Sequence, residues 1–299
     1  MNAVLIIDKP AGLTSHDVVD RVRRIVEQRS VGHLGTLDPL ATGVLPLVLG
    51  GLTRLAQFYT ASEKTYEGTM RFGFATDTYD AEGEPTTPPQ KASPALANVQ
   101  EVARRFRGVI EQMPPPFSAK KIHGVPAYKL ARKKKEVKLA PVQVTIHEFE
   151  IVSCAADRAD FRARVASGTY MRSVAHDLGR ELGCGGHLES LRRTSVAEFG
   201  LADARTLEQL ESAYDAAQFD EICVHPRKLL PQMPSVTVTD EIAGQVRSGR
   251  AVNLPDFSRA KQVKVFYGQR ELIAIATRVA GTLFHPKLVF AAENIPTFR

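Results

Sequence analysis

The sequence contains little cysteine. Its three cysteines, Cys154, Cys184 and Cys223, are widely spaced and form no C-x-x-C pair. An odd number at this spacing supports neither a disulfide framework nor a zinc knuckle. We therefore expect a protein of a reducing, cytoplasmic setting.

Long apolar runs are also absent. No uncharged stretch approaches the length that would cross a bilayer, and the first ten residues lack the basic region of a signal peptide. The sequence thus predicts a soluble protein without a membrane association. At 299 residues and 43% hydrophobic content, it is long enough for one large domain and a small one, each with its own core.

Acidic residues are outnumbered by basic ones. There are 33 aspartates and glutamates against 39 lysines and arginines, which gives a net charge of +6 and a pI near 9.2. Such a balance favours attraction to polyanions, although a merely basic soluble protein is an equally good reading of charge alone.

Apolar patterns in the first part of the chain predict alternating strands and helices. Residues 3–7 are typical of a buried strand, and Thr14-x-x-Asp17 resembles the capping box of a following helix. The apolar run 44–49 contains Pro46, which predicts an edge or irregular strand. Residues 77–90 are rich in Asp, Gly, Pro and Thr and predict a surface loop.

The middle of the chain predicts an antiparallel hairpin. Alternation over residues 142–151 changes phase near His147, which indicates one long strand with a bulge, and residues 161–165 form a second strand. Residues 171–182 have helical spacing and stop at Gly183. Tyr170 and Arg172 would then lie where a strand gives way to a helix.

The composition changes near residues 231–234. A small β-rich unit follows, with a short helix at 242–246 and β runs at 263–267 and 272–276. We place the domains at 1–232 and 233–299.

A proline-rich and then basic segment occupies residues 108–141 and contains Lys133, Lys134 and Lys135. Such a charge run is usually a solvated face. An arm that grips phosphate is the alternative.

The loop at residues 32–43 is the most unusual stretch, because it combines glycines, a proline, His33 and one carboxylate, Asp38. The proline keeps Asp38 out of the α region, so the loop can hold this carboxylate exposed as a nucleophile or general base. On these grounds alone, an Asp-Pro turn without chemistry is the commoner case. The glycines match neither a dinucleotide-binding fingerprint nor a Walker motif.

The segment GHLGTLDPLATGVLP at residues 32–46 closely resembles the active-site motif of the TruB-type tRNA pseudouridine-55 synthases. Further similar segments occur in the order expected for the family. They are LIIDKPAGLTS at 5–15, KTY at 64–66, PPPFSA at 114–119, GVPAY at 124–128, GTYMRS at 168–173 and LRRT at 191–194.

The resemblance implies an α+β pseudouridine-synthase core with a mixed, largely antiparallel sheet, followed by a small β-rich PUA-like domain. It implies an Asp nucleophile that attacks either C6 of the uracil or C1′ of the ribose, and no metal or organic cofactor. An oligomerisation module is the alternative reading of the C-terminal unit. The implied catalytic residues are Asp38, Tyr66, Tyr170 and Arg172, and the implied RNA-binding residues are His33, Lys9, Lys133, Lys134, Lys135 and Leu191.

In this reading Arg172 pairs with Asp38, Tyr66 stacks on the extracted base, and His33 helps hold T-loop bases out of their stack. Lys9 would support the Asp38 loop or a nearby phosphate. The expected partner is tRNA, bound by its T-arm and, through the C-terminal domain, its acceptor stem. We expect a monomer with no obligatory protein partner. A non-catalytic RNA-folding module and a synthase acting on ribosomal RNA are the rival readings.

Overall fold

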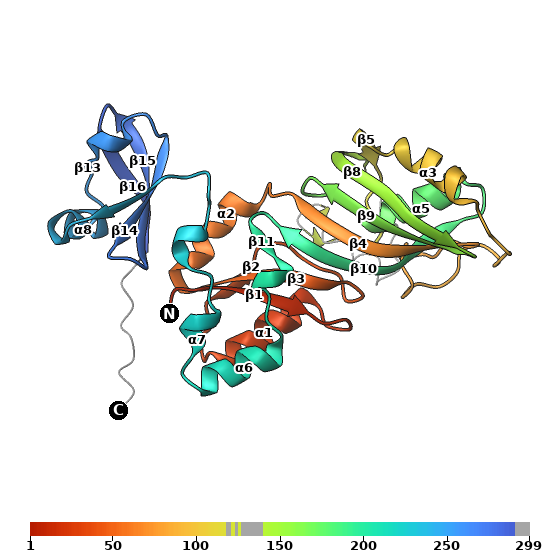
Figure 1. The fold of residues 1–299 in the computed structure, drawn as a ribbon, viewed down its shortest axis with the longest axis horizontal. Helices are drawn as coiled ribbons and strands as arrows, with labels where there is room; N and C mark the ends of the chain where they lie inside the picture. Colours follow the sequence, from red (N-terminus) through yellow and green to blue (C-terminus); the bar gives the residue numbers. More distant parts are fainter. Residues whose placement is uncertain (118–120, 123–124, 127–139, 291–299) are drawn as a thin grey trace.

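The computed structural model describes residues 1–117, 121–122, 125–126 and 140–290. Figure 1 shows a long sheet with helices packed on it and, at the other end of the molecule, a smaller C-terminal unit. No helix in the described ranges is long and apolar enough to cross a membrane.

The large sheet has nine strands in the order β1-β3-β10-β4-β9-β8-β5, with β2 paired to β3 and β11 paired to β10. Its neighbours are antiparallel except β3 and β10, which run parallel. The predicted α+β class with a mixed, largely antiparallel sheet is confirmed. The strands are β1 (Val4–Lys9), β2 (Val31–His33), β3 (Thr42–Leu49), β4 (Lys64–Phe72), β5 (Gly108–Gln112), β8 (Val142–Ala155), β9 (Arg158–Val165), β10 (Gly186–Val196) and β11 (Phe199–Gly200).

The longer helices cover one face of this sheet, and the short helical segments at 50–59 pack on the other. Thr14 is the N-cap of α1 and forms the predicted capping box with Asp17. Helix α5 begins directly after Tyr170, and Gly183 follows it with φ +73°, as the helix-stop pattern predicts. The helices and helical turns are α1 (Ser15–Ile25), η1 (Gly50–Leu55), α2 (Ala56–Tyr59), α3 (Leu96–Arg104), α5 (Met171–Glu181), η2 (Leu201–Asp203), α6 (Leu207–Asp215), α7 (Phe219–Ile222) and η3 (Pro226–Lys228).

The prediction that residues 44–49 form an edge or irregular strand is wrong. Pro46 lies inside the sheet, between β1 on one side and β2 and β10 on the other, and not in an edge strand. Its carbonyl accepts the Leu34 amide at 2.9 Å. The backbone nitrogen of a strand residue points to the same side as its carbonyl, and β2 has already ended at His33 there. The missing N–H of Pro46 therefore falls where the pairing of β2 with β3 ends.

The hairpin of β8 and β9 is confirmed. Strand β8 is continuous, and its register with β9 shifts between Ile146 and Glu148, where the pattern predicts a bulge. The shift lets the apolar side chains on both sides of His147 reach the same core.

Side chains of β1 alternate between two cores. Leu5 and Ile7 join the core beneath the helices, and Val4 and Ile6 join a second core on the other face. This alternation follows from the period of two along a strand. The second core includes Phe266 of the C-terminal unit, so it joins the two parts of the molecule.

The C-terminal unit is a five-stranded sheet in the order β12-β14-β15-β16-β13 with one helix, α8. It has a core of its own. The predicted β-rich architecture and short helix are therefore present. Its elements are β12 (Ser235–Val238), α8 (Asp240–Arg247), β13 (Val252–Asn253), η4 (Pro255–Phe257), β14 (Gln262–Tyr267), β15 (Glu271–Ala280) and β16 (Leu283–Val289).

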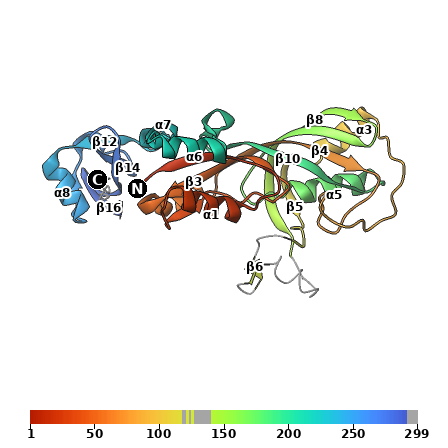
Figure 2. The same ribbon diagram turned by 90° about the horizontal axis from the view of Figure 1, so that it is seen from below.

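The segment at 108–141 is described only in part. Its first residues are β5, an outer strand of the large sheet, and the short strands β6 (Lys121–Ile122) and β7 (Val125–Pro126) pair with each other. Figure 2 shows this pair projecting from the body of the protein. Lys133, Lys134 and Lys135 lie outside the described residues.

Candidate active site

The Asp38 loop joins β2 to β3 and is held firmly at its base. The Ser15 hydroxyl, at the start of α1, donates to the Leu37 carbonyl at 3.0 Å and accepts the Leu37 amide at 2.7 Å. Gly43, with φ +98°, lies against β10, where a β-carbon would fall 2.2 Å from the Arg193 carbonyl oxygen. Glycine is thus required where the loop enters the sheet.

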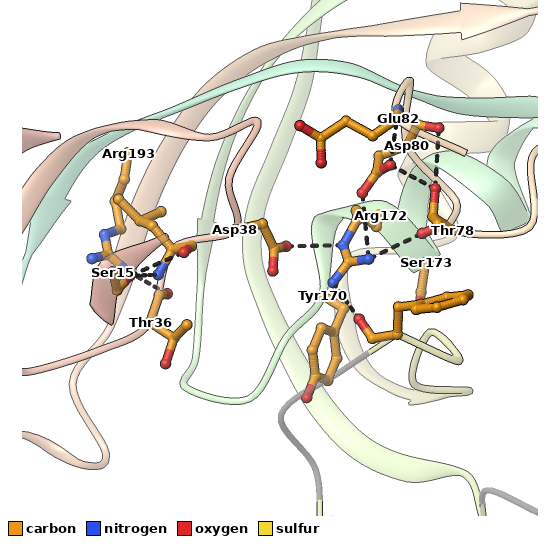
Figure 3. Close-up of polar contacts among 12 residues, drawn as sticks. Ser15, Thr36, Asp38, Thr78, Asp80, Glu82, Tyr170, Arg172, Ser173 and Arg193 are labelled. Carbon is orange, nitrogen blue, oxygen red and sulfur yellow. Dashed lines mark hydrogen bonds and ion pairs between the residues drawn. The ribbon is translucent and has the colours of Figure 1, made fainter. Parts of the chain in front are cut away.

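Arg172, in the first turn of α5, lies between two carboxylates, as Figure 3 shows. Its Nε is 2.9 Å from Oδ2 of Asp38, and its Nη1 is 3.4 Å from Oδ2 of Asp80. Nη1 and Nη2 also donate to the carbonyls of Thr78 and Phe117 at 3.0 and 2.9 Å. Because the Arg172 side chain is only 5% exposed, these contacts fix the orientation of the guanidinium toward Asp38.

Asp80 is a functional candidate that the sequence pattern did not reveal. It belongs to the loop at 77–90, yet its side chain is 5% exposed. The Thr78 hydroxyl and the Glu82 amide donate to its Oδ1 at 2.6 and 3.1 Å. The sequence does show Thr76, Thr78 and Asp80 at alternate positions, and such side chains often hydrogen-bond to neighbouring groups of a loop. This pattern gives no indication that the loop folds inward onto α5.

The charge state of Asp38 follows from opposing influences. Burial raises the pKa of Asp38, the positive charge of Arg172 lowers it, and the negative charge of Asp80 raises it again. The side chain is nevertheless 39% exposed, so it remains open to a ligand on one side. Without Arg172 this carboxyl would be far more readily protonated, so the arginine maintains the ionised form.

Asp38 opens into a cavity of about 430 Å³. This volume lies within the usual range of small-ligand sites, roughly 300–1,000 Å³. Tyr66 from β4, Tyr170 before α5 and Leu191 from β10 line the cavity together with Asp38 and Arg172. Five residues expected in the site are thus brought together.

A larger hollow of about 550 Å³ elsewhere on the sheet is a weaker candidate for a catalytic site. Both of its arginines are already paired, Arg162 with Glu67 at 2.9 Å and Arg192 with Asp8 at 2.8 Å, and its Asp160 accepts from the hydroxyls of Thr69 and Ser153. The Asp38 cavity is therefore the candidate site, because it presents an oriented carboxylate.

The two tyrosines are held in different ways. Tyr66 is 7% exposed and interacts with the buried Arg193. The backbone of Tyr170 is clamped by the side chain of Gln112, which accepts its amide at 2.8 Å and donates to its carbonyl at 3.1 Å. Gln112 is itself 1% exposed, so the start of α5 is fixed to β5.

The position of Lys9 contradicts its predicted role in RNA binding. Its side chain is fully buried, and Nζ donates to the carbonyls of Pro10, Leu13 and Pro39 at 2.7, 2.6 and 3.2 Å. A lysine in this position cannot contact an RNA phosphate. Lys9 instead fixes the turn that follows Asp38, which was the other role considered for it. Burial lowers the pKa of Lys9 to about 8.

Arg193 is a second residue whose place the pattern did not reveal. It is fully buried, and its guanidinium donates to the carbonyls of Val44, Thr36 and Gly35 at 2.8, 3.1 and 3.0 Å. It therefore ties the loop that carries Asp38 to β10. The signal was the run at 191–194, which includes Arg193 but gives no indication that its guanidinium is buried.

His33 does not line the cavity. It is half-buried at the end of β2, its Nδ1 lies 3.4 Å from the Gly35 amide, and burial lowers its pKa. His33 thus lies where the Asp38 loop begins, and its predicted contact with RNA stays a prediction.

The arrangement can perform nucleophilic or general-base chemistry. One carboxylate is oriented by an arginine and faces a cavity of nucleotide size with two tyrosines in its wall. Aromatic walls suit a flat base, which can stack on them.

Solved structures identify the fold. The chain superimposes on a Cbf5-Nop10-Gar1 complex with a TM-score of 0.71 and 25% identity, covering 97% of this chain and 85% of that one. It superimposes equally well, at a TM-score of 0.71 and 23% identity, on an H/ACA RNP bound to a substrate RNA containing 2′-deoxyuridine, covering 98% and 86%. The fold is that of the pseudouridine synthases.

Sequence comparisons specify the family. Residues 23–171 match the TruB family pseudouridylate synthase N-terminal domain, and residues 172–232 match the tRNA pseudouridylate synthase B C-terminal domain. The tRNA pseudouridine synthases B of Solibacter usitatus and Aquifex aeolicus are 48% and 38% identical, each over 97% of this chain and 100% of the relative. The chain belongs to the TruB family and is a pseudouridine synthase.

Proposed function

We propose that this enzyme converts uridine 55 in the T-loop of tRNA to pseudouridine, with Asp38 as the nucleophile. The observation that supports this role is the Asp38 carboxylate, paired with Arg172 at 2.9 Å and open to the cavity. The names of the relatives, tRNA pseudouridine synthase B, support tRNA as the substrate.

The reaction is an isomerisation, so no atoms are gained or lost overall. The bond between uracil N1 and ribose C1′ breaks, the base turns, and a bond forms between C5 and C1′. The C5 proton leaves and N1 gains a proton. Asp38 attacks either C6 or C1′ and is released at the end. The scheme uses no metal or organic cofactor.

Four cavity residues besides Asp38 have roles in this scheme. Arg172 keeps Asp38 ionised and aimed at the target. Tyr66 stacks on the extracted uracil and assists removal of the C5 proton, and Tyr170 and Leu191 complete the wall. Flipping a base out of a folded loop costs a few kcal/mol. Stacking in the cavity and phosphate contacts outside it offset that cost.

Contacts beyond the cavity would come from two regions. We assign T-arm phosphate binding to Lys133, Lys134 and Lys135, with His33 beside the flipped nucleotide, and acceptor-stem contacts to the PUA-like domain at 233–299. The catalytic domain is then 1–232. Neutralising the three lysines should weaken tRNA binding and flatten its salt dependence. An unchanged salt slope in a binding titration would remove them from the interface. We further propose a cytoplasmic monomer without an obligatory protein partner.

The decisive experiment uses unmodified tRNA transcript labelled with tritium at uracil C5. Wild-type protein should release tritium without any added cofactor, and the modified position should map to uridine 55. Asp38→Asn should bind the transcript but release no tritium. Asp160 is an exposed aspartate outside the cavity, so Asp160→Asn is the matched control and should behave as wild type.

Each result is informative. Tritium release by Asp38→Asn, free of wild-type contamination, would refute Asp38 as the nucleophile. Release at another uridine would refute the position. Binding without release by the wild type would favour an RNA-folding protein over an enzyme acting on tRNA.

A further inference from the structure

The loop that carries Asp80 contains a strained residue. Tyr79 has φ +65°, in the left-handed region that bulky side chains rarely adopt. Its two neighbours both contact Arg172, Thr78 through its carbonyl at 3.0 Å and Asp80 through its carboxylate at 3.4 Å. The reversal at Tyr79 is what lets two successive groups of the loop reach the same guanidinium.

The backbone around Tyr79 is also tied to the sheet. The Leu188 amide donates to the Tyr79 carbonyl at 3.0 Å, and the Ala81 amide donates to the Leu188 carbonyl at 2.9 Å. These bonds fix where the loop crosses β10. These bonds do not contact α5, so the loop is held against that helix by Arg172 and by one further contact.

The Tyr79 ring makes that contact. It stacks on the imidazole of His176 with centroids 3.9 Å apart and planes inclined by 17°. His176 follows Arg172 by four residues on α5, so both side chains project from the same face of the helix, one turn apart. The loop thus meets α5 at two adjacent points, one polar and one aromatic.

The environment of His176 fits a stacking role. Its Nδ1 is buried and has no hydrogen-bond partner in the part of the chain that the structure describes. Burial lowers the pKa of His176; nearby Asp177 opposes this and Arg180 adds to it. The ring is therefore neutral near pH 7 and offers Tyr79 a flat surface.

We propose that the Tyr79–His176 stack is a positioning element that holds Thr78 and Asp80 on Arg172 and thereby sets the aim of Arg172 at Asp38. Neither ring touches the reacting atoms in this assignment. The proposal rests on the proposed function in one respect, since its readout is turnover by Asp38.

The test separates the ring from the backbone at Tyr79. Tyr79→Phe and His176→Phe keep two stacked rings and should retain wild-type kcat. His176→Ala and Tyr79→Ala lose the stack and should lower kcat about three- to tenfold, as expected from the strength of one aromatic pair. Tyr79→Gly should keep more activity than Tyr79→Ala, because glycine adopts the left-handed conformation without strain. The dissociation constant for tRNA should stay within about twofold throughout.

A double variant tests whether the stack acts through Asp80. If it does, adding Tyr79→Ala to Asp80→Asn should lower kcat little further, so the two effects should not be additive. Tyr214→Ala controls for loss of an aromatic pair away from Arg172, because Tyr214 meets Phe219 edge-on at 5.9 Å between α6 and α7. This control should lose thermal stability without losing kcat.

Several outcomes would overturn the proposal. They are full kcat in His176→Ala and Tyr79→Ala, additive losses with Asp80→Asn, or loss of kcat in His176→Phe. A wild-type protein that releases no tritium contradicts the proposed function instead, so the two failures are distinguishable.

Discussion

The two sides of the Asp38 loop bury positive charge in different ways. On the side facing the cavity, Arg172 lies between two carboxylates. Lys9 and Arg193, in contrast, are fully buried and donate mainly to backbone carbonyls, and Arg193 also contacts Tyr66 in the cavity wall. The first arrangement balances charge around a group that reacts, and the second fixes the backbone that carries it.

This difference determines what each cation can do. A buried cation paired with a carboxylate changes that carboxylate's charge and aim. A buried cation among carbonyls satisfies acceptors in an irregular segment, such as those of Gly35 and Thr36, which lie outside the strands. Removing the first should chiefly affect turnover, and removing the second should chiefly affect stability.

The largest effect is expected from Arg172→Gln. It leaves Asp38 and Asp80 near each other without a cation, so Asp38 should become protonated more readily and lose its orientation. We expect kcat to fall by about 10²- to 10³-fold and the free energy of unfolding to fall by about 3–5 kcal/mol. Single-turnover assays and urea denaturation measure the two losses.

Arg172→Lys is the matched variant, because it keeps the charge but not the forked geometry that reaches Asp38, Asp80 and two carbonyls at once. It should recover stability more than kcat. Full recovery of kcat would mean that charge alone, without orientation, accounts for the role of Arg172.

The next effect is expected from Arg193→Met, which leaves the carbonyls of Val44, Thr36 and Gly35 without their donor. We expect a loss of about 2–4 kcal/mol in unfolding free energy and a fall in kcat of less than about tenfold. Arg192→Met is the matched control. Its side chain is 40% exposed and pairs with Asp8, so it should cost less than about 1 kcal/mol. Equal losses in the two variants would contradict the loop-fixing role.

The same contrast explains what could be predicted from the sequence. Asp38, Tyr66 and Arg172 were predictable because each lies in a short motif whose residues are contiguous. The helix caps and the hairpin followed from local patterns at Thr14 and His147. Asp80 was not predictable, because its burial depends on a loop folding across β10 onto α5.

The burial of Lys9 and Arg193 was also not predictable from the sequence. Lys9 and Arg193 are of types that are almost never fully buried unless paired. Their partners include carbonyls far along the chain, Pro39 for Lys9 and Thr36 for Arg193. The prediction for Pro46 was wrong for a related reason, because whether a proline fits inside the sheet depends on where the neighbouring strand β2 ends. Local pattern contains none of this information.

A smaller effect should appear in the pH dependence of stability. Burial lowers the pKa of Lys9 to about 8 from 10.5. Between these values the unfolded chain binds more protons at this site than the folded one, so wild type should gain stability as pH rises through this window. Relative to Lys9→Met, the gain should be on the order of 1–3 kcal/mol. Urea denaturation of both proteins at pH 7.5 and 10 measures it. A stability difference independent of pH would show that Lys9 is not a buried cation.

The smallest effect is a shift in the acidic limb of the pH–rate profile. Asp38 must be ionised to attack, and burial raises its pKa above the ordinary 3.8, so kcat/KM should fall with decreasing pH at a midpoint above 3.8. The negative charge of Asp80 contributes to that rise. Asp80→Asn should therefore move the midpoint to lower pH, while the plateau rate falls because Arg172 loses one of its two anchors. The plateau reports orientation and the midpoint reports charge, so one profile measures both functions of the cavity side. A midpoint that moves upward would mean that Asp80 acts on Asp38 mainly by keeping Arg172 in place.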